Sequence, residues 1–403
     1  MRIFMVLFLK LTLLSPFASA EDKLSIHAFL DKVQAQNLDL KVEQAKLESA
    51  EAQSSAIGLP PPMVSISKLT EKEGSSAQGF EVSQMIPFPG KLIKDKSSRN
   101  LEAQTQKLVF STKQKELQSE AILAFYEYWA TSEKILILKQ RNRILSNHLK
   151  LARSGVRSDS SLKLHLLKTE SDLDLLENDL ETANQDLEEK RLKMAVLMNL
   201  PSSTKIPEPE EPPLSSLPAE PESTIDLPQL KVSELQLQTL TTRESEAKQS
   251  WFPDFTLSYK EMGATQMMPQ YSEIMVGMTL PFLFAWEPSS EVKKASAQRH
   301  EAELQYEKMK QETNSLRSIS WTRARSIRKQ LTTLQEKIIP KAHKRMQLIN
   351  NIAPRDMESL QDHRETMETF SDLQLKVLDL RLSYEKSLSE LEKWIPISGA
   401  ANE

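Results

Sequence analysis

Apolar and polar residues alternate with period two in two parts of the chain, which is typical of β-strands with one apolar face. In the first part we expect strands at about 63–69 and 79–87, and in the second at about 254–262 and 272–281. A loop rich in turn-forming residues separates the two strands of each pair, so each part predicts one β-hairpin. The apolar face of the second hairpin is expected to carry Phe255, Leu257, Ile274, Val276 and Leu280.

Each predicted hairpin is followed by a long segment without glycine or proline, at 91–154 and at 289–339. Helix is the economical interpretation, and at 1.5 Å per residue the first segment would extend roughly 95 Å. After a short turn, each segment is expected to fold back as a return helix, at 159–200 and at 356–395. The first return helix has the seven-residue spacing of a coiled coil at Leu166, Leu173, Leu180, Leu187 and Met194.

The two halves of the chain have the same order of predicted elements, which indicates an internal repeat. Residues 21–200 would form the first repeat and 226–396 the second, each with a helix, a β-hairpin, a very long helix, a turn and a return helix. A segment rich in proline and glutamate at 201–225 is interpreted as a linker, and 397–403 as a short tail. The predicted fold class is therefore mainly α with a small β contribution.

The N-terminus has the pattern of a secretory signal peptide. Arg2 precedes an apolar run that Lys10 interrupts, and Ala18-Ser19-Ala20 follows as a cleavage site, so we expect 1–20 to be removed. No later stretch is apolar over the roughly 20 residues that a transmembrane helix needs. The chain has no cysteine, which excludes disulfides, thiolate metal sites and a lipid-anchored N-terminal cysteine.

Composition narrows the function classes. Charged residues make up 27% of the chain and aromatic residues only 6%, a balance that suits long helices with narrow buried seams. The net charge of −4 offers no basic surface for phosphates, so we expect no nucleic-acid partner. No catalytic motif is present and the six histidines lack metal-ligand spacing, so we predict no enzyme activity, no cofactor and no metal centre.

Five methionines lie in or near the second hairpin: Met262, Met267, Met268, Met275 and Met278. Thioether sulfur suits soft ions such as Cu(I), which would give these residues a role in metal export. Packing against lipid or within the loop is the favoured interpretation, because methionine is a common apolar filler. The sequence leaves both interpretations open.

Four strands per chain match the length of tilted transmembrane strands, but four strands cannot close a barrel. In lipid every sheet edge must be paired, so several chains must contribute strands to one barrel. Three chains would give an even-numbered barrel of about twelve strands.

An ordered set of short motifs across both halves resembles the TolC-type outer-membrane efflux proteins. Its clearest members are Asn37-Leu38-Asp39-Leu40, Pro87-Phe88-Pro89-Gly90-Lys91, Ser154-Gly155-Val156, Met198-Asn199-Leu200-Pro201, Phe252-Pro253-Asp254-Phe255 and Ile338-Ile339-Pro340. No single motif is decisive, but their order and spacing cover nearly the whole mature chain. The resemblance implies a homotrimer with a twelve-stranded barrel in outer-membrane lipid and an α-helical barrel in the periplasm.

The resemblance also implies a function and its sites. The trimer would be a passive conduit that docks to a periplasmic adaptor and an inner-membrane transporter, in a tripartite efflux or type I secretion system. The adaptor would meet the helix turns, around Gly155 and Val156 and around Ala353 and Arg355, where Ala353-Pro354 departs from the usual glycine. The closed aperture would be lined by Asp362 and Glu358. The family's companion acidic position is Ser359 in this chain, so the second charge is expected at Glu358 instead; the alternative is that Asp362 and Glu358 are ordinary solvated helix residues.

Two other functions remain open at this stage. Periplasmic adaptors also have long helical hairpins, although typically one hairpin flanked by small β-domains, and a coiled-coil scaffold protein would need no membrane strands at all. The exported substrate, whether drugs, heavy metals such as copper or proteins, is not determined by the sequence.

Overall fold

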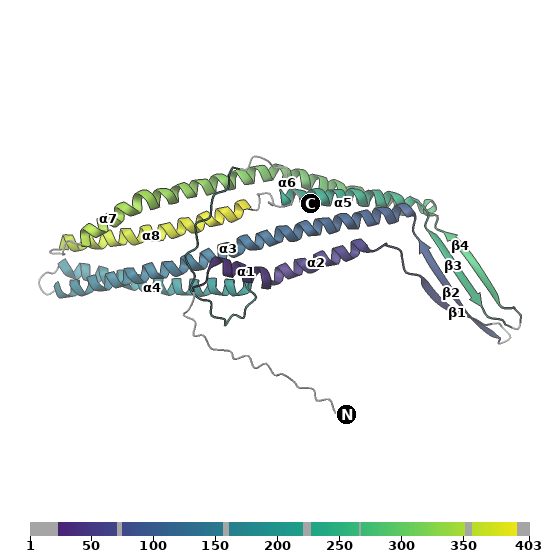
Figure 1. The fold of residues 1–403 in the computed structure, drawn as a ribbon, viewed down its shortest axis with the longest axis horizontal. Coiled ribbons are helices and arrows are strands. Elements are labelled where there is room, and N and C mark those ends of the chain that lie inside the picture. The colour runs from purple at the N-terminus through teal and green to yellow at the C-terminus, as the bar shows by residue number, and fades with distance from the viewer. Residues whose placement is uncertain are drawn as a thin grey trace, which may run out of the picture.

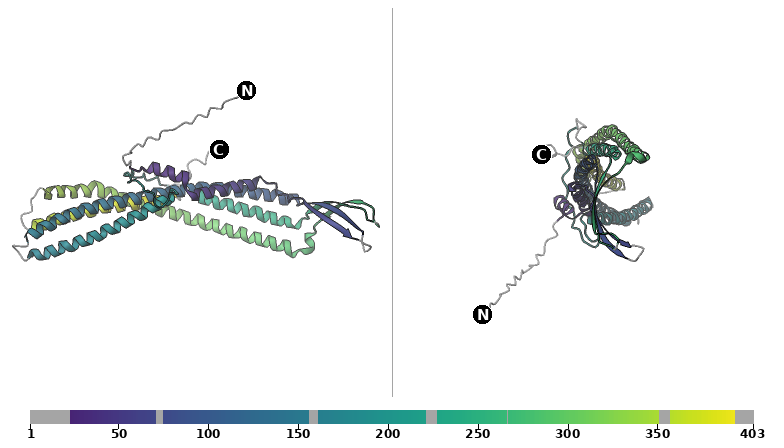
Figure 2. Two further views of the ribbon diagram at one scale, coloured as in Figure 1. Left: turned by 90° about the horizontal axis from the view of Figure 1, so that it is seen from below. Right: turned by 90° about the vertical axis from the view of Figure 1, so that its right-hand side faces the viewer.

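The computed structural model describes residues 23–70, 75–155, 161–220, 227–265, 267–350 and 357–392. The molecule is a long rod of helices with a small sheet at one end, and the views in Figure 1 and Figure 2 agree on this shape. The expected signal peptide and C-terminal tail lie outside the described residues. Within the described ranges, the prediction of a mainly helical fold with two β-hairpins is confirmed.

The two halves repeat the same order of elements. The first half consists of α1 (Ile26–Gln36), α2 (Leu38–Ser55), β1 (Met63–Thr70), β2 (Ser76–Ile86), α3 (Pro89–Gly155) and α4 (Ser161–Leu197). The second half consists of α5 (Pro228–Lys248), β3 (Phe255–Met262), β4 (Tyr271–Met278), α6 (Trp286–Thr333), α7 (Ile339–Asn350) and α8 (Met357–Glu392). Helix α1 has no counterpart among the described residues of the second half, and its cap Ser25 accepts a hydrogen bond from the Ala28 amide.

The second long helix does not end at Pro340, as the sequence suggested, but continues through it into α7. Proline has no N–H and its ring clashes with the preceding turn, which would break a regular helix. The backbone avoids the clash with one π-helical turn at Leu334–Ile338, where the Ile339 amide donates to the Leu334 carbonyl. The second long helix is therefore longer than predicted and contains one π-helical turn.

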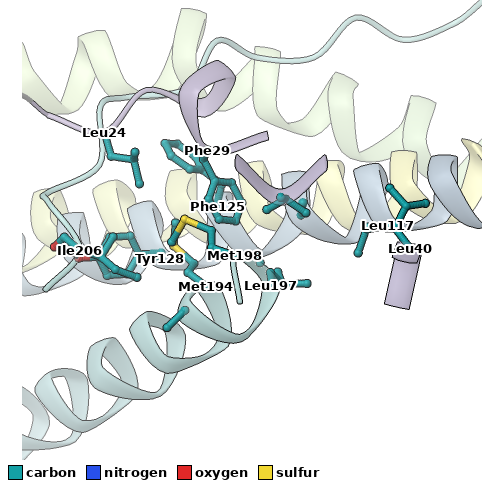
Figure 3. Close-up of a cluster of buried hydrophobic side chains, with 14 residues drawn as sticks. Leu24, Phe29, Leu40, Leu117, Phe125, Tyr128, Met194, Leu197, Met198 and Ile206 are labelled. Atoms are coloured by element: carbon teal, nitrogen blue, oxygen red, sulfur yellow. Dashed lines mark hydrogen bonds between the residues drawn. The ribbon is translucent and has the colours of Figure 1, made fainter. Parts of the chain in front are cut away.

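Helices α3 and α4 pack along their length as a coiled coil. The α4 side chains at heptad spacing, including Leu176, Ala183 and Met194, are buried against α3. Near the middle of the rod, Phe29 of α1 packs on Phe125 of α3 with ring centroids 5.9 Å apart, in the cluster that Figure 3 draws. This cluster is the largest apolar core of the described part of the chain.

Two motifs of the first half act as helix ends at this core. The Asn37 side-chain oxygen accepts hydrogen bonds from the Asp39 and Leu40 amides and so caps α2, while its Nδ2 donates to the Leu197 carbonyl at 3.0 Å. Asn199 has a positive φ of 53°, which lets the Leu200 amide donate back to the Ala195 carbonyl and ends α4. The motif residues thus fix where α2 begins relative to where α4 stops.

The proline-rich linker forms an irregular segment, called the strap below, that crosses the middle of the rod. Its described part, 201–220, has almost no regular structure, yet it is fastened by side chains from the helices. Arg381 of α8 donates to the Pro212 carbonyl at 2.7 Å, and the Trp321 indole of α6 donates to the Pro218 carbonyl at 3.2 Å. Tyr126 of α3 also donates to the Pro213 carbonyl, so the linker contacts α3, α6 and α8, and Figure 1 shows it crossing the rod near its middle.

Candidate functional site

The four strands form one antiparallel sheet in the order β1-β2-β3-β4, so the hairpins of the two repeats lie side by side. Directly paired residues share a face. One row across the sheet is apolar and consists of Val64, Val82, Tyr259 and Ile274. The next row, on the opposite face, is polar and consists of Ser65, Glu81, Lys260 and Glu273. The registers therefore give the sheet one apolar and one polar face.

The apolar face is the more exposed of the two, which is the reverse of a water-soluble protein. Ile66 is 84% exposed and Val276 is 75% exposed, whereas Ser258 on the polar face is only 6% exposed. Of the residues proposed for a lipid-facing side, Phe255, Leu257, Ile274 and Val276 share the apolar face, and Leu280 follows the end of β4. An apolar surface of this kind needs an apolar environment.

Each outer strand of the sheet has an edge without a strand partner in the described part of the chain. Strand β1 pairs only with β2, and β4 pairs only with β3. The strands are 8 to 11 residues long, and eight residues span about 26 Å, close to the thickness of a membrane's apolar layer. An edge with free N–H and C=O groups is not tolerated in hydrocarbon.

A hydrogen-bonded junction joins the sheet to the helices and connects the two repeats. The Asp254 carboxylate accepts from the Phe88 amide at 2.8 Å and from Lys91 Nζ at 2.8 and 2.9 Å. The rings of Phe88 and Phe252 stack with centroids 4.6 Å apart. A Cβ on Gly90 would lie 2.6 Å from the Gln249 side-chain oxygen and 2.9 Å from the Phe88 ring, so a larger residue would require both side chains to move. The motifs Pro87-Phe88-Pro89-Gly90-Lys91 and Phe252-Pro253-Asp254-Phe255 therefore contact each other.

The helical hairpins point away from the sheet and end at the opposite end of the rod (Figure 1). Gly155 is the last residue of α3, while Val156, Ala353 and Arg355 lie outside the described residues. Asp362 is exposed on α8, near this end. Glu358 belongs to the same helix, but its side chain is not described. The structure thus brings Asp362 to the far end of the rod without defining the ring that the resemblance implies.

Two contacts at this end tie α8 to the first hairpin, and the sequence did not reveal either of them. His148 Nε2 of α3 lies 3.0 Å from His363 Nδ1 of α8, and one of these nitrogens donates to the other. Next to His363, Arg364 forms an ion pair with Asp172 of α4 at 3.1 Å. The histidines are separated by 215 positions in the sequence, so no spacing rule could pair them.

Burial holds both histidines in the neutral form. Desolvation, with the neighbouring His363 and Arg364 as further causes, lowers the pKa of His148 to about 4. Desolvation also lowers the pKa of His363. The α3–α8 contact near Asp362 is therefore a pair of uncharged rings at neutral pH.

The five methionines of the second hairpin do not gather at one place. Met262 is buried at the loop end of β3, whereas Met278 lies at the other end of β4, opposite Phe255. Met275 and Met278 point to opposite faces, and Met267 and Met268 are exposed in the loop. Among the described residues, no group of three or more His, Cys, Asp or Glu side chains is arranged to hold a metal ion.

Solved structures with the same arrangement exist, although no family model and no curated protein matches the sequence. The CmeC outer membrane channel of Campylobacter jejuni matches 92% of this chain and 85% of its own, with a TM-score of 0.78 and 15% identity. The open state of the MtrE outer membrane channel of Neisseria gonorrhoeae matches 92% and 88%, with a TM-score of 0.76 and 15% identity. The chain has the fold of these outer-membrane channels.

A structure of CusC, described in terms of transmembrane channel formation, agrees with 92% of both chains covered, a TM-score of 0.75 and 13% identity. At these identities the likeness establishes the channel fold, and it confirms at that level the resemblance seen in the sequence motifs. None of the described helices is apolar enough over a sufficient length to cross a membrane.

Proposed function

We propose that the protein is the outer-membrane subunit of an export system and that it forms a homotrimeric, passive channel. The observation that carries this proposal is the sheet, with its apolar face outward and its polar face partly buried. A sheet of this polarity is stable when lipid covers the apolar face and water the other. The two unpaired edges then require partner strands from further copies of the chain.

Three copies are the smallest number that makes a conduit. Two copies would give eight strands, and the interior of an eight-stranded barrel is only wide enough to be filled by side chains. Three copies would give about twelve strands and leave a lumen lined by the polar face. The fold shared with CmeC and MtrE, which are outer membrane channels, supports the same location and role for this chain.

The helices would continue the lumen on the periplasmic side. Because both helical hairpins extend away from the sheet, their turns would project toward the inner membrane. We place the contact with a periplasmic adaptor and an inner-membrane transporter at these turns, around Gly155 and Ala353. Asp362 and Glu358 would then lie at the periplasmic mouth.

Membrane fractionation combined with gel migration tests the channel proposal. The mature protein should be found in the outer-membrane fraction and migrate as an SDS-resistant trimer that boiling converts to a monomer. A soluble protein that does not form trimers would exclude the channel and leave the periplasmic adaptor. A soluble protein that forms filaments would favour the coiled-coil scaffold.

The orientation of the rod has its own test. Photoactivatable or thiol crosslinkers at cysteines introduced for Val156 and Arg355 should capture the adaptor in intact cells. Cysteines in the β3–β4 loop, for example at Met267, serve as the matched control and should not. Capture from Met267→Cys alone would reverse the orientation.

A further inference from the structure

The unpaired edges of β1 and β4 carry enough information to define how neighbouring copies join, if the trimeric channel proposed above is correct. Within one chain, a row of directly opposite residues runs perpendicular to the strands from Val64 through Val82 and Tyr259 to Ile274. In a closed barrel such a row returns to its first strand displaced by several residues, and this displacement is called the slip. Any slip that a closed barrel needs must therefore occur where β4 of one copy meets β1 of the next.

Barrel geometry sets the size of this slip. Strands that lie about 4.8 Å apart, with a rise of about 3.3 Å per residue, close a twelve-stranded barrel at a tilt of about 35–45° only if the total slip is roughly 12–17 residues. Threefold symmetry divides the slip equally, which leaves about 4 to 6 residues per seam. The slip must also be even, because an odd slip would turn the apolar face of one copy into the lumen.

The extent of the strands selects one register. Ile274 could lie opposite a position about four residues beyond Val64, which is Lys68, or about four residues before it, which is Pro60. Pro60 lies outside β1 and cannot donate a ladder hydrogen bond. With Lys68, residues 64–70 of one copy lie opposite 278–272 of the other, so nearly the whole of both strands is paired. A slip of about six residues would leave part of both strands unpaired.

We infer that β4 of each copy pairs with β1 of the next in the register that places Met278 opposite Val64 and Val276 opposite Ile66. On the outer face this register joins two pairs of apolar residues and places Lys68 opposite Ile274 toward the loop end of the sheet, where a lysine side chain can extend to the membrane surface. On the inner face it places Gly277 opposite Ser65. The apolar belt and the polar lumen then both continue across the seam.

A second observation, independent of barrel geometry, supports the seam between β4 and β1. Two apolar segments at opposite edges of the chain are exposed just below the sheet. Ile57, 72% exposed, and Leu59 precede β1, while Leu283, Phe284 and Trp286, 67% exposed, follow β4. Because Met278 lies opposite Val64 in this register, the two segments leave the seam from neighbouring strand ends at the same level. The same seam therefore covers both segments, with each serving as the partner of the other in a second copy.

Pairs of introduced cysteines test the register. The chain has no cysteine of its own, so every disulfide that forms must involve the introduced residues. Val64→Cys with Met278→Cys should form disulfides between copies, since directly opposite strand residues have Cα atoms about 4.5–5.5 Å apart. Within one chain β1 and β4 are three strand spacings apart, about 14 Å, which excludes an internal disulfide. Oxidation in membranes should give covalent dimers and trimers on non-reducing gels.

Matched pairs one register step away serve as controls. Ile66→Cys with Met278→Cys and Val64→Cys with Val276→Cys should crosslink at least tenfold more slowly than the inferred pair. Faster crosslinking of either control pair overturns the register. Intact trimers in which none of the three pairs crosslinks overturn the β4–β1 seam, whereas a cysteine-free parent that never forms trimers contradicts the channel proposal itself.

The apolar contact below the sheet has a separate readout. Leu59→Cys with Leu283→Cys should also link neighbouring copies, because the register brings these segments to the same level. If the strand pair crosslinks and this pair does not, lipid and not the neighbouring copy covers Leu283 and Trp286, and the lower contact is wrong.

Discussion

Neighbouring side chains on β4 point to opposite sides of the sheet, so adjacent positions should tolerate charge very differently. Val276 lies on the apolar face, opposite Leu257, and Met275 lies on the polar face, opposite Ser258. The two side chains are both large and both exposed in the single chain. Their difference is therefore one of environment in the assembled barrel and not of packing within the chain.

We expect Val276→Arg to weaken trimer assembly and Met275→Arg to be tolerated. Arginine on a lipid face near the midplane costs about 2–4 kcal/mol, while the lumen offers water to the same group. The measurement is the yield of heat-modifiable trimer in outer-membrane fractions. Equal yields from the two variants would show that β4 does not have one lipid-facing side.

The His148–His363 pair is a second feature at the residue scale. The pKa of His148 is lowered to about 4 in the folded protein, whereas a solvated histidine titrates near 6.5. The neutral ring is therefore favoured in the packed state. The stability that this contributes is fully present above pH 6.5 and is lost as the pH falls from 6.5 toward 4.

We expect the contact between α3 and α8 to weaken by about 2 kcal/mol per chain between pH 7.5 and pH 5. The midpoint of thermal dissociation of the trimer in detergent should fall accordingly. His148→Gln, which keeps a hydrogen-bonding group without a titratable ring, is the matched control and should lose most of this pH dependence. An unchanged pH profile in His148→Gln would mean that other groups cause it.

At the scale of elements, the junction between sheet and helices depends on a single carboxylate. Asp254 binds the Phe88 amide and the Lys91 ammonium group, so it connects the strand of one repeat to the helix of the other. Its backbone also pairs with Thr279 just beyond β4, through hydrogen bonds of 2.8 and 2.9 Å. The angle at which the barrel meets the rod is therefore held by contacts between the repeats.

Graded substitutions of Asp254 should separate the two interactions. Asp254→Asn keeps an oxygen for the Phe88 amide but removes the charge that binds Lys91, and it should cost about 1 kcal/mol. Asp254→Ala removes both and leaves a partly buried amide unpaired, at a cost of about 2–3 kcal/mol. The urea concentration at the midpoint of unfolding, measured on detergent-solubilised trimer, gives the order of stability of the variants. Lys91→Met should resemble Asp254→Asn, and an alanine variant as stable as wild type would contradict the role of the junction.

At the scale of the whole molecule, we propose that the narrowest point of the channel lies at the periplasmic end of the helices. Asp362 is exposed near that end, and Glu358 lies one helical turn before it on α8. Three copies would place three pairs of carboxylates around one mouth. Acidic rings of this kind raise the local concentration of cations and favour their passage.

In planar bilayers we expect Asp362→Asn combined with Glu358→Gln to lower cation preference and to weaken block by multivalent cations added from the periplasmic side. Asp379→Asn, an exposed carboxylate farther along α8, is the control and should leave both properties unchanged. Selectivity and block that survive the double substitution would remove these residues from the aperture.

Much of this architecture follows from local patterns. The period-two alternation in β1 to β4, the segments free of glycine and proline, and the heptads of α4 each need only neighbouring residues, because side-chain direction in a strand or helix depends on spacing alone. The motif residues Asn37 and Asn199 likewise act as caps within a few positions of their own helix ends. The repeat then implied that both halves have the same order of elements.

Only the tertiary structure decided which distant residues meet. Asp254 with Lys91, His148 with His363, and the strap carbonyls with Arg381 and Trp321 join positions far apart in the chain, and no local period records such pairs. Helix α1 and the passage of the helix through Pro340 were also decided there. A local rule predicts that a helix ends at a proline. Here one π-helical turn relieves the clash at Pro340, and the helix continues because the packing of α7 on α8 favours the longer helix.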